Sequence, residues 1–289
     1  MFRTPRRTRG NLSEIAVTTS DWQLAPVRAE RPFVAIGDVH GAAGLLGALL
    51  GSVRRSCDSA AVFLGDLIDP SARHASTHDC ARVVDLVARD VRQFGSVVLG
   101  GNHDSMFLIA LACARGGEAP PWRAGTWRAQ GGRETAAAWG VDADAVADEP
   151  ALAKAVWDRM DTAQRAVFAD MRDWHDVGHY LFVHAGFRPD MPLDAQQARA
   201  RLTCWPDDRQ AHHLWMRFAP GEDVAPPGRI LVHGHAPAPL PTLGVRRICI
   251  DTDAKRGGPL TLLEVEDDRM RLQQAWPVAT RTATDALDP

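Results

Sequence analysis

The sequence predicts an α/β fold, and two observations support this prediction. Three times in the first half of the chain, a short apolar run typical of a strand is followed by a polar turn and a stretch long enough for a helix. The chain of 289 residues also has an ordinary globular composition, with 45% hydrophobic and 24% charged residues. That composition argues against disorder, a collagen-like repeat and a coiled coil.

The three strand–turn–helix units lie within residues 32–113. Strands are expected at 32–36, 60–64 and 96–99, and helices at 42–53, 79–94 and 105–113. In open α/β sheets, ligands bind at the carboxyl ends of the strands. We therefore expect the polar turns after these strands to meet in one site.

The segment after these units has a different composition. Residues 115–176 contain frequent Gly and Pro, tryptophans that include Trp122, Trp127, Trp139 and Trp157, and helical patterns at 152–160 and 163–171, which we interpret as a helical insertion covering one side of the site. Strands are expected to resume at 180–183, 230–232, 247–250 and 260–265. The predicted organisation is a flexible arm over 1–30, one domain over 31–276 with the insertion at about 115–176, and a flexible tail over 277–289.

Charge and cysteine content limit the classes of function. Thirty-three basic and 36 acidic side chains give a net charge of -3, so no global positive field indicates nucleic-acid binding. No apolar run approaches the roughly 18 residues that cross a bilayer. Five cysteines, odd in number and widely spaced, fit a reducing compartment. We expect a cytoplasmic protein without nucleic-acid or membrane partners.

The polar residues that follow the predicted strands are of the kinds that bind metals. Carboxylate, imidazole and amide groups without a thiolate suit Mn, Fe or Zn in a catalytic site. Their number exceeds what one ion accepts beside water, and a carboxylate can bridge two ions. The candidates are Asp38, His40, Asp66, Asn102, His103, His184, and His233 or His235.

Five motifs in order resemble those of the calcineurin-like metallophosphoesterases, in particular the phosphoprotein phosphatase branch with its bacterial serine/threonine phosphatases. The resemblance spans about residues 33–265 and implies a central β-sandwich flanked by helices. The motifs are Gly37–Gly41 (GDVHG), Gly65–Asp69 (GDLID), Gly101–Asp104 (GNHD), His184–Gly186 (HAG) and Gly234–His235 (GH).

The resemblance also implies a role for each ligand. Asp38 and His40 would hold the first metal, Asp66 would bridge, and the second metal would be held by Asn102, His184 and His235. The cofactors would be two divalent or mixed-valence ions, manganese first, with iron or zinc as alternatives. His233 is expected to pack behind the site, and the six histidines outside the motifs are expected at the surface or as caps.

A water activated by the two metals would attack the phosphorus, and His103 would be the catalytic histidine, held by Asp69. The chemistry agrees, because an imidazole beside the phosphate can protonate a leaving alkoxide, while a second carboxylate fixes its tautomer. Asp251 is expected either to orient a ligand histidine or to cap a turn.

Arginine is the side chain expected to bind the phosphate. Arg217 matches the phosphate-binding arginine of the family. The family usually has an arginine and a glycine directly after the aspartate that Asp69 matches, whereas this chain has Pro70-Ser71 and then a longer loop. We hypothesise that Arg73, or else Arg133 from the insertion, supplies the missing charge.

These features predict a metal-dependent phosphomonoester hydrolase, a phosphatase of phosphoserine or phosphothreonine, or of phosphotyrosine, whose partner is a phosphorylated protein or a small phosphoester. A Rossmann domain or a P-loop is not indicated, because neither glycine motif is present. One alternative is a symmetrical dinucleoside tetraphosphate hydrolase, although it should need extra basic residues and the chain has only two lysines. The other is a catalytically inactive metal-binding scaffold, which Pro70 makes conceivable.

Overall fold

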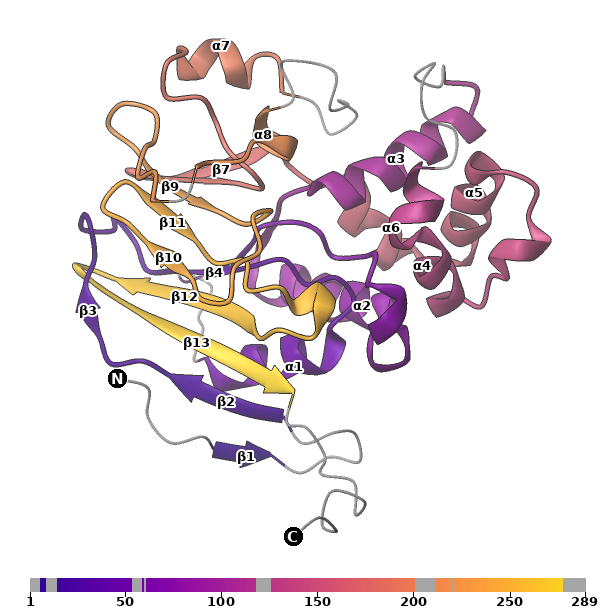
Figure 1. The fold of residues 1–289 in the computed structure, drawn as a ribbon, viewed down its shortest axis with the longest axis horizontal. Helices are drawn as coiled ribbons and strands as arrows, with labels where there is room; N and C mark the ends of the chain where they lie inside the picture. The colour runs from indigo at the N-terminus through magenta and orange to yellow at the C-terminus, as the bar shows by residue number, and fades with distance from the viewer. Residues whose placement is uncertain are drawn as a thin grey trace, which may run out of the picture.

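Two mixed β-sheets pack face to face with helices outside them (Figure 1). The computed structural model describes residues 6–8, 15–53, 59, 61–117, 126–200, 212–219 and 221–277. The larger sheet has the strand order β1-β2-β13-β12-β4-β5-β6, with β3 also paired to β13. Its strands are β1 (Arg6–Thr8), β2 (Ile15–Thr19), β3 (Gln23–Leu24), β4 (Phe33–Ile36), β5 (Ala61–Phe63), β6 (Val97–Val98), β12 (Leu260–Glu266) and β13 (Arg269–Pro277).

The smaller sheet has the order β10-β11-β9-β8-β7. Within it β8, β9 and β11 are parallel, as β4, β5 and β6 are in the larger sheet. Its strands are β7 (Trp174–Val177), β8 (Tyr180–Val183), β9 (Ile230–His233), β10 (Thr242–Leu243) and β11 (Arg247–Cys249).

Strand β4 shows how the sequence builds the layers. Phe33 and Ala35 point into the core between the sheets, where the Phe33 ring lies 4.9 Å from the rings of both Tyr180 and Phe182. Val34 and Ile36 point to the other face and join the core beneath the helices. A strand buried on both faces is a continuous apolar run, which is why this one is visible in the sequence.

Helices lie on the outer faces of both sheets and gather at one end of the molecule (Figure 1). They are α1 (Ala43–Ser52), α2 (Cys80–Phe94), α3 (Asn102–Ala114), α4 (Arg133–Ala138), α5 (Glu149–Arg159), α6 (Thr162–Ala169), α7 (Leu193–Gln197) and α8 (His212–Trp215). Short helical turns are η1 (Ala72–Thr77), η2 (Arg128–Gly132), η3 (Ala143–Ala145) and η4 (Ala254–Arg256). None of these described helices is long and apolar enough to cross a membrane.

The sandwich and its flanking helices confirm the predicted fold class. Two differences from the predicted boundaries concern the site and the larger sheet. Helix α3 begins at Asn102 rather than at 105, because the Asp104 carboxylate accepts a hydrogen bond from the Gly101 backbone N–H at 2.9 Å and caps the helix there. Asn102 and His103 therefore stand on the first helical turn instead of on a loop.

The N-terminal segment also differs from the expected arm over 1–30. Residues 15–19 form β2, which pairs antiparallel with β13 from Ile15 opposite Pro277 to Thr19 opposite Gln273. Because these backbone groups are hydrogen-bonded to a neighbouring strand, this part of the segment belongs to the sheet. The domain limits, with the insertion and the tail over 277–289, stay a prediction, and residues 278–289 lie outside the described residues.

Candidate active site

The carboxyl ends of β4, β5, β6, β8 and β9 converge on one group of polar side chains, as the strand–turn pattern predicts. Four of these residues have left-handed backbone conformations, with φ of 45° at His40, 50° at Asp66, 66° at Asp69 and 65° at His235. Such conformations cost residues with a side chain on the order of 1–3 kcal/mol each and persist where the surroundings enforce them. The His40 N–H, for example, donates to the Asp66 carbonyl at 2.8 Å.

Two glycines allow the carboxylates to approach the backbone. A Cβ on Gly101 would overlap the Asp66 carboxylate, and a Cβ on Gly234 would overlap that of Asp38. These glycines precede Asn102 and His235, so the motifs GN and GH combine a ligand with the space that its neighbouring carboxylate needs.

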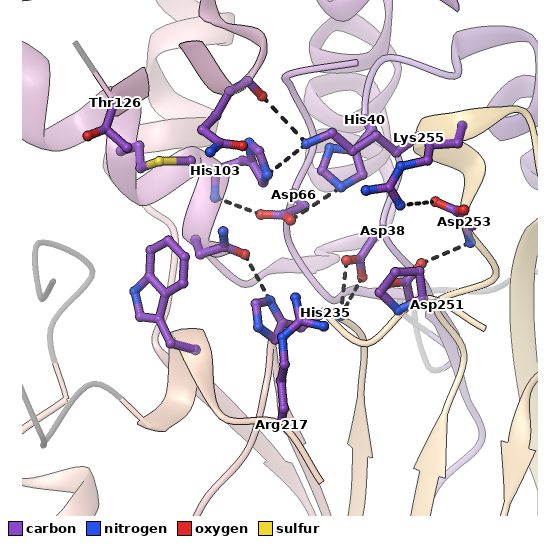
Figure 2. Close-up of a pocket in the computed structure, with 16 residues that line it drawn as sticks. Asp38, His40, Asp66, His103, Thr126, Arg217, His235, Asp251, Asp253 and Lys255 are labelled. Atoms are coloured by element: carbon purple, nitrogen blue, oxygen red, sulfur yellow. Dashed lines mark hydrogen bonds and ion pairs between the residues drawn. The ribbon is translucent and has the colours of Figure 1, made fainter. Parts of the chain in front are cut away.

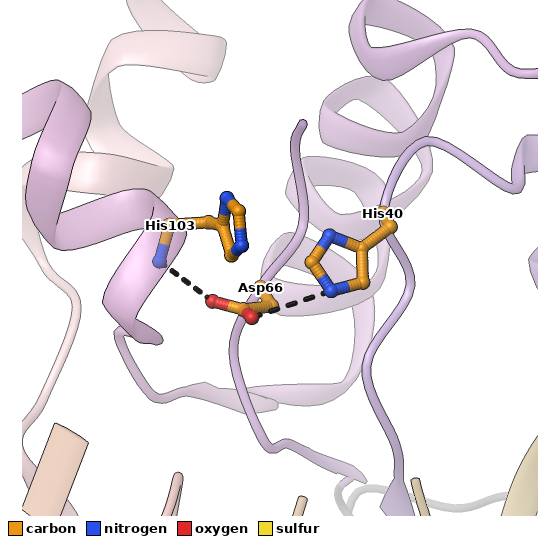
Figure 3. A group of neighbouring side chains, drawn as sticks. All are labelled: His40, Asp66 and His103. Carbon is orange, nitrogen blue, oxygen red and sulfur yellow. Dashed lines mark hydrogen bonds and ion pairs between the residues drawn. The ribbon is translucent and has the colours of Figure 1, made fainter. Parts of the chain in front are cut away.

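Asp66 stands at the centre of the group (Figure 3). Its Oδ2 lies 3.3 Å from His40 Nε2 and 3.6 Å from His184 Nε2, and its Oδ1 accepts a hydrogen bond from the His103 backbone N–H at 2.9 Å. The Nδ1 atoms of His40 and His184 lie 2.8 Å from the carbonyls of Ile68 and Leu64. Each Nδ1–H therefore donates to the backbone and leaves an Nε2 lone pair facing the carboxylate.

The same arrangement recurs beside Asn102. Its Oδ1 lies 3.0 Å from both His184 Nε2 and His235 Nδ1, while the buried His235 Nε2 has no hydrogen-bond partner among the described residues. The His184 Nε2 lone pair thus faces two oxygens that accept and do not donate. Acceptors that face one another in a buried site need a cation between them.

The charge of Asp38 supports the same conclusion. Burial raises the pKa of Asp38 well above its usual range, and the neighbouring carboxylates of Asp251 and Asp66 raise it further. Ligand atoms of Asp38, Asp66 and His184 lie within 4.8 Å of one another, and so do those of His40, Asp66 and His103. Asp66 belongs to both groups, and these oxygen and nitrogen donors fit two divalent ions with a shared carboxylate.

His103 differs from the other histidines of the site because its ring lies between a carboxylate and an ammonium. Nδ1 lies 2.9 Å from Asp69 Oδ2, and Nε2 lies 2.8 Å from the ammonium of Lys255. Burial lowers the pKa of His103 well below its usual value, although the nearby Asp66 opposes that shift. An imidazole held by a carboxylate at one nitrogen is suited to acid–base chemistry at the other.

Two residues of the segment predicted as an insertion hold Asp69 in place. Asp69 Oδ1 accepts hydrogen bonds from Trp127 Nε1 at 3.0 Å and from the Thr135 hydroxyl at 2.6 Å. Burial raises the pKa of Asp69 to about 7, against the lowering effect of the Thr135 hydrogen bond. Trp127 and Thr135 were not expected at the site from the sequence. The only signal for them is the resemblance of Trp127, Gly131-Gly132 and Glu134-Thr135 to bacterial phosphatase insertions.

A pocket of about 340 Å³ opens onto the site and is lined, among others, by Asp38, His40, Asp66, Asn102, His103 and His235 (Figure 2). The cations of this pocket only partly match expectation. Arg217 lies at the pocket as predicted, together with Lys255 and Arg256 from η4. Arg73 is instead exposed on η1 and does not line the pocket, and Arg133 forms an ion pair with Asp144 on the surface. The structure therefore brings neither proposed substitute arginine to the site.

The remaining predicted residues lie around this pocket. Asp251 accepts a hydrogen bond from the Asp253 backbone N–H at 3.0 Å, which is the turn-capping role of the two expected. His233 packs behind the site, with its Nε2 accepting from Arg247 at 3.1 Å. His213 was expected at the surface or as a cap. It is buried and lies 3.3 Å from an Asp173 carboxylate oxygen, so the surface position was wrong.

Comparison with known proteins identifies the class. The chain belongs to the calcineurin-like phosphoesterase family, whose model matches residues 31–258. Its fold is similar to the crystal structure of a candidate diadenosine tetraphosphatase, with a TM-score of 0.52 and 17% identity over 86% of this chain and 95% of that one. It is also similar to a protein serine/threonine phosphatase from Saccharomyces cerevisiae with similarity to human phosphatase PP5, with a TM-score of 0.54 and 12% identity over 88% and 82% of the chains.

A search of curated protein sequences finds no significant match. The family assignment makes this chain a metal-dependent hydrolase of phosphoesters, and the family uses a dinuclear divalent metal site. The two clusters around Asp66 are the candidate positions for that site in this chain.

Proposed function

We propose that this enzyme hydrolyses phosphomonoesters and that its substrate is a phosphorylated serine or threonine side chain of a protein, with phosphotyrosine as a further possible target. The observation that supports the chemistry best is the position of the Asp66 carboxylate between the imidazole nitrogens of His40 and His184. A yeast serine/threonine phosphatase with a similar fold supports the substrate class.

Six residues would hold the metals. Asp38 and His40 would bind one ion, Asp66 both, and Asn102, His184 and His235 the other, with manganese as the proposed metal and iron or zinc as alternatives. When bound, the two ions supply the positive charge that activates water and that neutralises the phosphoryl oxygens.

The protein side chains would handle the proton and the substrate. Transfer of a proton to the leaving oxygen needs an imidazolium at His103, with its Nδ1–H donating to Asp69 and its Nε2–H directed into the pocket. The Asp69 carboxylate stabilises that imidazolium, and Trp127 and Thr135 keep the carboxylate in position. Arg217 would bind a phosphate oxygen from the opposite side of the pocket (Figure 2).

A symmetrical dinucleoside tetraphosphate hydrolase is the second candidate. One observation favours it: Lys255 and Arg256 add two cations to the pocket beside Arg217, and such cations would suit a longer run of phosphates. However, Arg256 is paired with Asp253 at 3.0 Å. We therefore retain the monoester as the proposed substrate.

We also propose that the protein acts in the cytoplasm, without nucleic-acid or membrane partners. The three described cysteines, Cys80, Cys113 and Cys249, are free thiols, which supports a reducing compartment. The described helices offer no membrane span.

The test is a single activity screen with Mn²⁺ on one purified sample. The substrates are p-nitrophenyl phosphate, peptides containing phosphoserine, phosphothreonine or phosphotyrosine, and diadenosine tetraphosphate. Phosphopeptide hydrolysis should dominate and should be abolished in Asp66→Asn, whereas Asp170→Asn, at an exposed aspartate after α6, should retain it. Faster hydrolysis of diadenosine tetraphosphate would support the second candidate, and a Mn-loaded sample inert toward every substrate would support the inactive scaffold.

A further inference from the structure

The residue after Asp69 leaves the pocket short of one cation. Pro70 is buried and carries no charge, and the loop that follows it forms η1. Arg73, the nearest arginine in that loop, is exposed and does not line the pocket. A phosphate dianion at the metals would therefore find no cation from this loop on the His103 side.

The segment that packs against this loop brings a cation to that side. The Ser71 backbone N–H donates to the Lys255 carbonyl at 3.4 Å, so η4 lies directly beside the position after Pro70. The longer loop supports η4 through two histidines. His78 Nε2 lies 3.1 Å from the Ala254 carbonyl, and a Cβ on Gly257 would come within 2.9 Å of His74.

The Lys255 side chain is available for an anion. Its ammonium lies 2.8 Å from His103 Nε2 and 3.5 Å from the Gln130 carbonyl (Figure 2). Among the residues that the structure describes, no carboxylate forms an ion pair with it, whereas Lys154, the other lysine, pairs with Asp158 at 2.6 Å on the surface. A partly buried ammonium whose partners are both neutral gains most from an entering anion.

We propose that Lys255 binds the substrate phosphate on the His103 side of the pocket, in place of the arginine that Pro70 displaces. Lys255 and Arg217 would then hold the phosphate from opposite sides, since Figure 2 shows them on either side of the Asp66 group. Because Lys255 is hydrogen-bonded to His103 Nε2 in the free pocket, a phosphate that attracts the ammonium would leave this nitrogen facing the leaving oxygen. The inference rests on the proposed phosphomonoesterase activity.

Lys255→Met removes the charge and keeps a side chain of similar length, and Lys255→Arg keeps the charge. The matched control is Lys154→Met on the exposed face of α5. Binding of inorganic phosphate to the Mn-loaded protein is measured by calorimetry, and KM and kcat are measured with p-nitrophenyl phosphate. Metal content and the unfolding temperature are measured for each variant.

The loss of one charge-assisted hydrogen bond should weaken phosphate binding about 10- to 100-fold in Lys255→Met. The KM should rise in parallel, Lys255→Arg should restore most of the binding, and Lys154→Met should behave like the wild type. Phosphate affinity within about 2-fold of the wild type in a metal-loaded Lys255→Met, or a large loss in Arg73→Ala instead, would overturn the proposal.

Two further measurements separate a failure of this proposal from a damaged variant and from a failure of the proposed function. If Lys255→Met loses its metal or unfolds, Lys255→Gln tests the same charge, and the same limits decide. If the wild type binds phosphate and turns over no monoester, the proposed function fails, while the calorimetry still decides whether Lys255 holds phosphate.

Discussion

Asp69 holds His103, and its replacement by asparagine exchanges one carboxylate oxygen for an NH₂ group. Asparagine Oδ1 can still accept from Trp127 and Thr135, which bond to Asp69 Oδ1 at 3.0 and 2.6 Å. The amide NH₂ would then take the place of Asp69 Oδ2, which lies 2.9 Å from His103 Nδ1. The packing is kept, but without its anionic acceptor the imidazolium is less stable, so less of His103 carries the proton that the leaving oxygen needs.

General acid catalysis contributes about 10²- to 10⁴-fold, so kcat toward an alkyl phosphate or a phosphoserine peptide should fall by at least about 100-fold. The loss should be much smaller for p-nitrophenyl phosphate, because its leaving group needs little protonation. Rates for both substrates are measured with Mn-loaded protein under saturating conditions. An equal loss on both substrates would refute the assignment of Asp69 and His103 to leaving-group protonation.

The same variant tests the electrostatics of burial in the metal-free protein. The pKa of Asp69 is raised by burial from the usual 3.8 to about 7. Because the folded protein holds this proton more tightly than the unfolded chain, the associated stability is complete below about pH 4 and is lost as the pH rises through about 7. The difference between the two pKa values corresponds to at most about 4 kcal/mol.

Urea unfolding in EDTA at pH 5 and pH 8 measures the part of the stability that depends on the protonation of Asp69. Over that interval the wild type should lose about 2–3 kcal/mol more of its free energy of unfolding than Asp69→Asn, which has no carboxyl group to ionise. Titrating groups that do not interact with Asp69 are shared by the two proteins and cancel in the comparison. Equal pH dependence in both proteins would show that Asp69 ionises as easily in the folded chain as in the unfolded one.

Two further predictions concern a backbone glycine and the metals. Gly131→Ala would place a Cβ 2.6 Å from Asp69 Cβ at a φ of 125°, so this variant should lose about 1–3 kcal/mol of stability and at least about 10-fold in kcat. The control is Gly51→Ala, whose Cβ would meet open space, and it should be as stable as the wild type or about 0.5–1 kcal/mol more stable. Mn²⁺ at 100 times its dissociation constant should stabilise the wild type by about 2.7 kcal/mol in thermal unfolding, and the gain should be small in Asp66→Asn. Unaltered activity in Gly131→Ala, or equal stabilisation of both proteins by Mn²⁺, would contradict these expectations.

The sequence predicted the position of the candidate site residues where a buried strand ends directly at a motif. Strands β4, β5 and β8 are short and buried on both sides, so each appears as an apolar run that ends at a polar turn. Because parallel strands present their carboxyl ends at one edge, the predicted ligands meet without any further information. Family resemblance then assigned roles that the spacing alone left open, such as the choice between His233 and His235.

Strand β13 was missed for a physical reason. Residues 269–272 alternate arginine with Met270 and Leu272, which is a strand pattern, but Gln273 and Gln274 follow and break it. In the structure both glutamines are buried and bond to other side chains, Gln273 to Glu264 and Gln274 to Thr261. A pattern of hydrophobicity does not detect a buried polar residue whose partners are distant in sequence.

Lys255 was missed for a related reason, since its partner His103 lies 152 positions away. Contacts at that separation depend on how η1 and η4 pack, and no local propensity encodes them. The scarcity of lysine was a usable signal: one of the two lysines, Lys255, lies four positions after the predicted site residue Asp251. Arg73 was expected to replace the missing arginine because it is close to Pro70 along the chain, but closeness along the chain does not bring its side chain into the pocket.

The metal-free site is energetically unfavourable in several independent ways. Left-handed backbone at four residues costs on the order of 1–3 kcal/mol each, the pKa of Asp38 is raised by burial and by neighbouring carboxylates, and the His184 lone pair faces oxygen acceptors. The sandwich core holds this arrangement, since strands buried on both faces fix the turns that carry the ligands. Cations relieve the electrostatic part of the cost but not the backbone part. Two metal ions and a lysine close to His103 would balance the carboxylates locally, which explains how a chain with a net charge of -3 can bind a phosphate dianion.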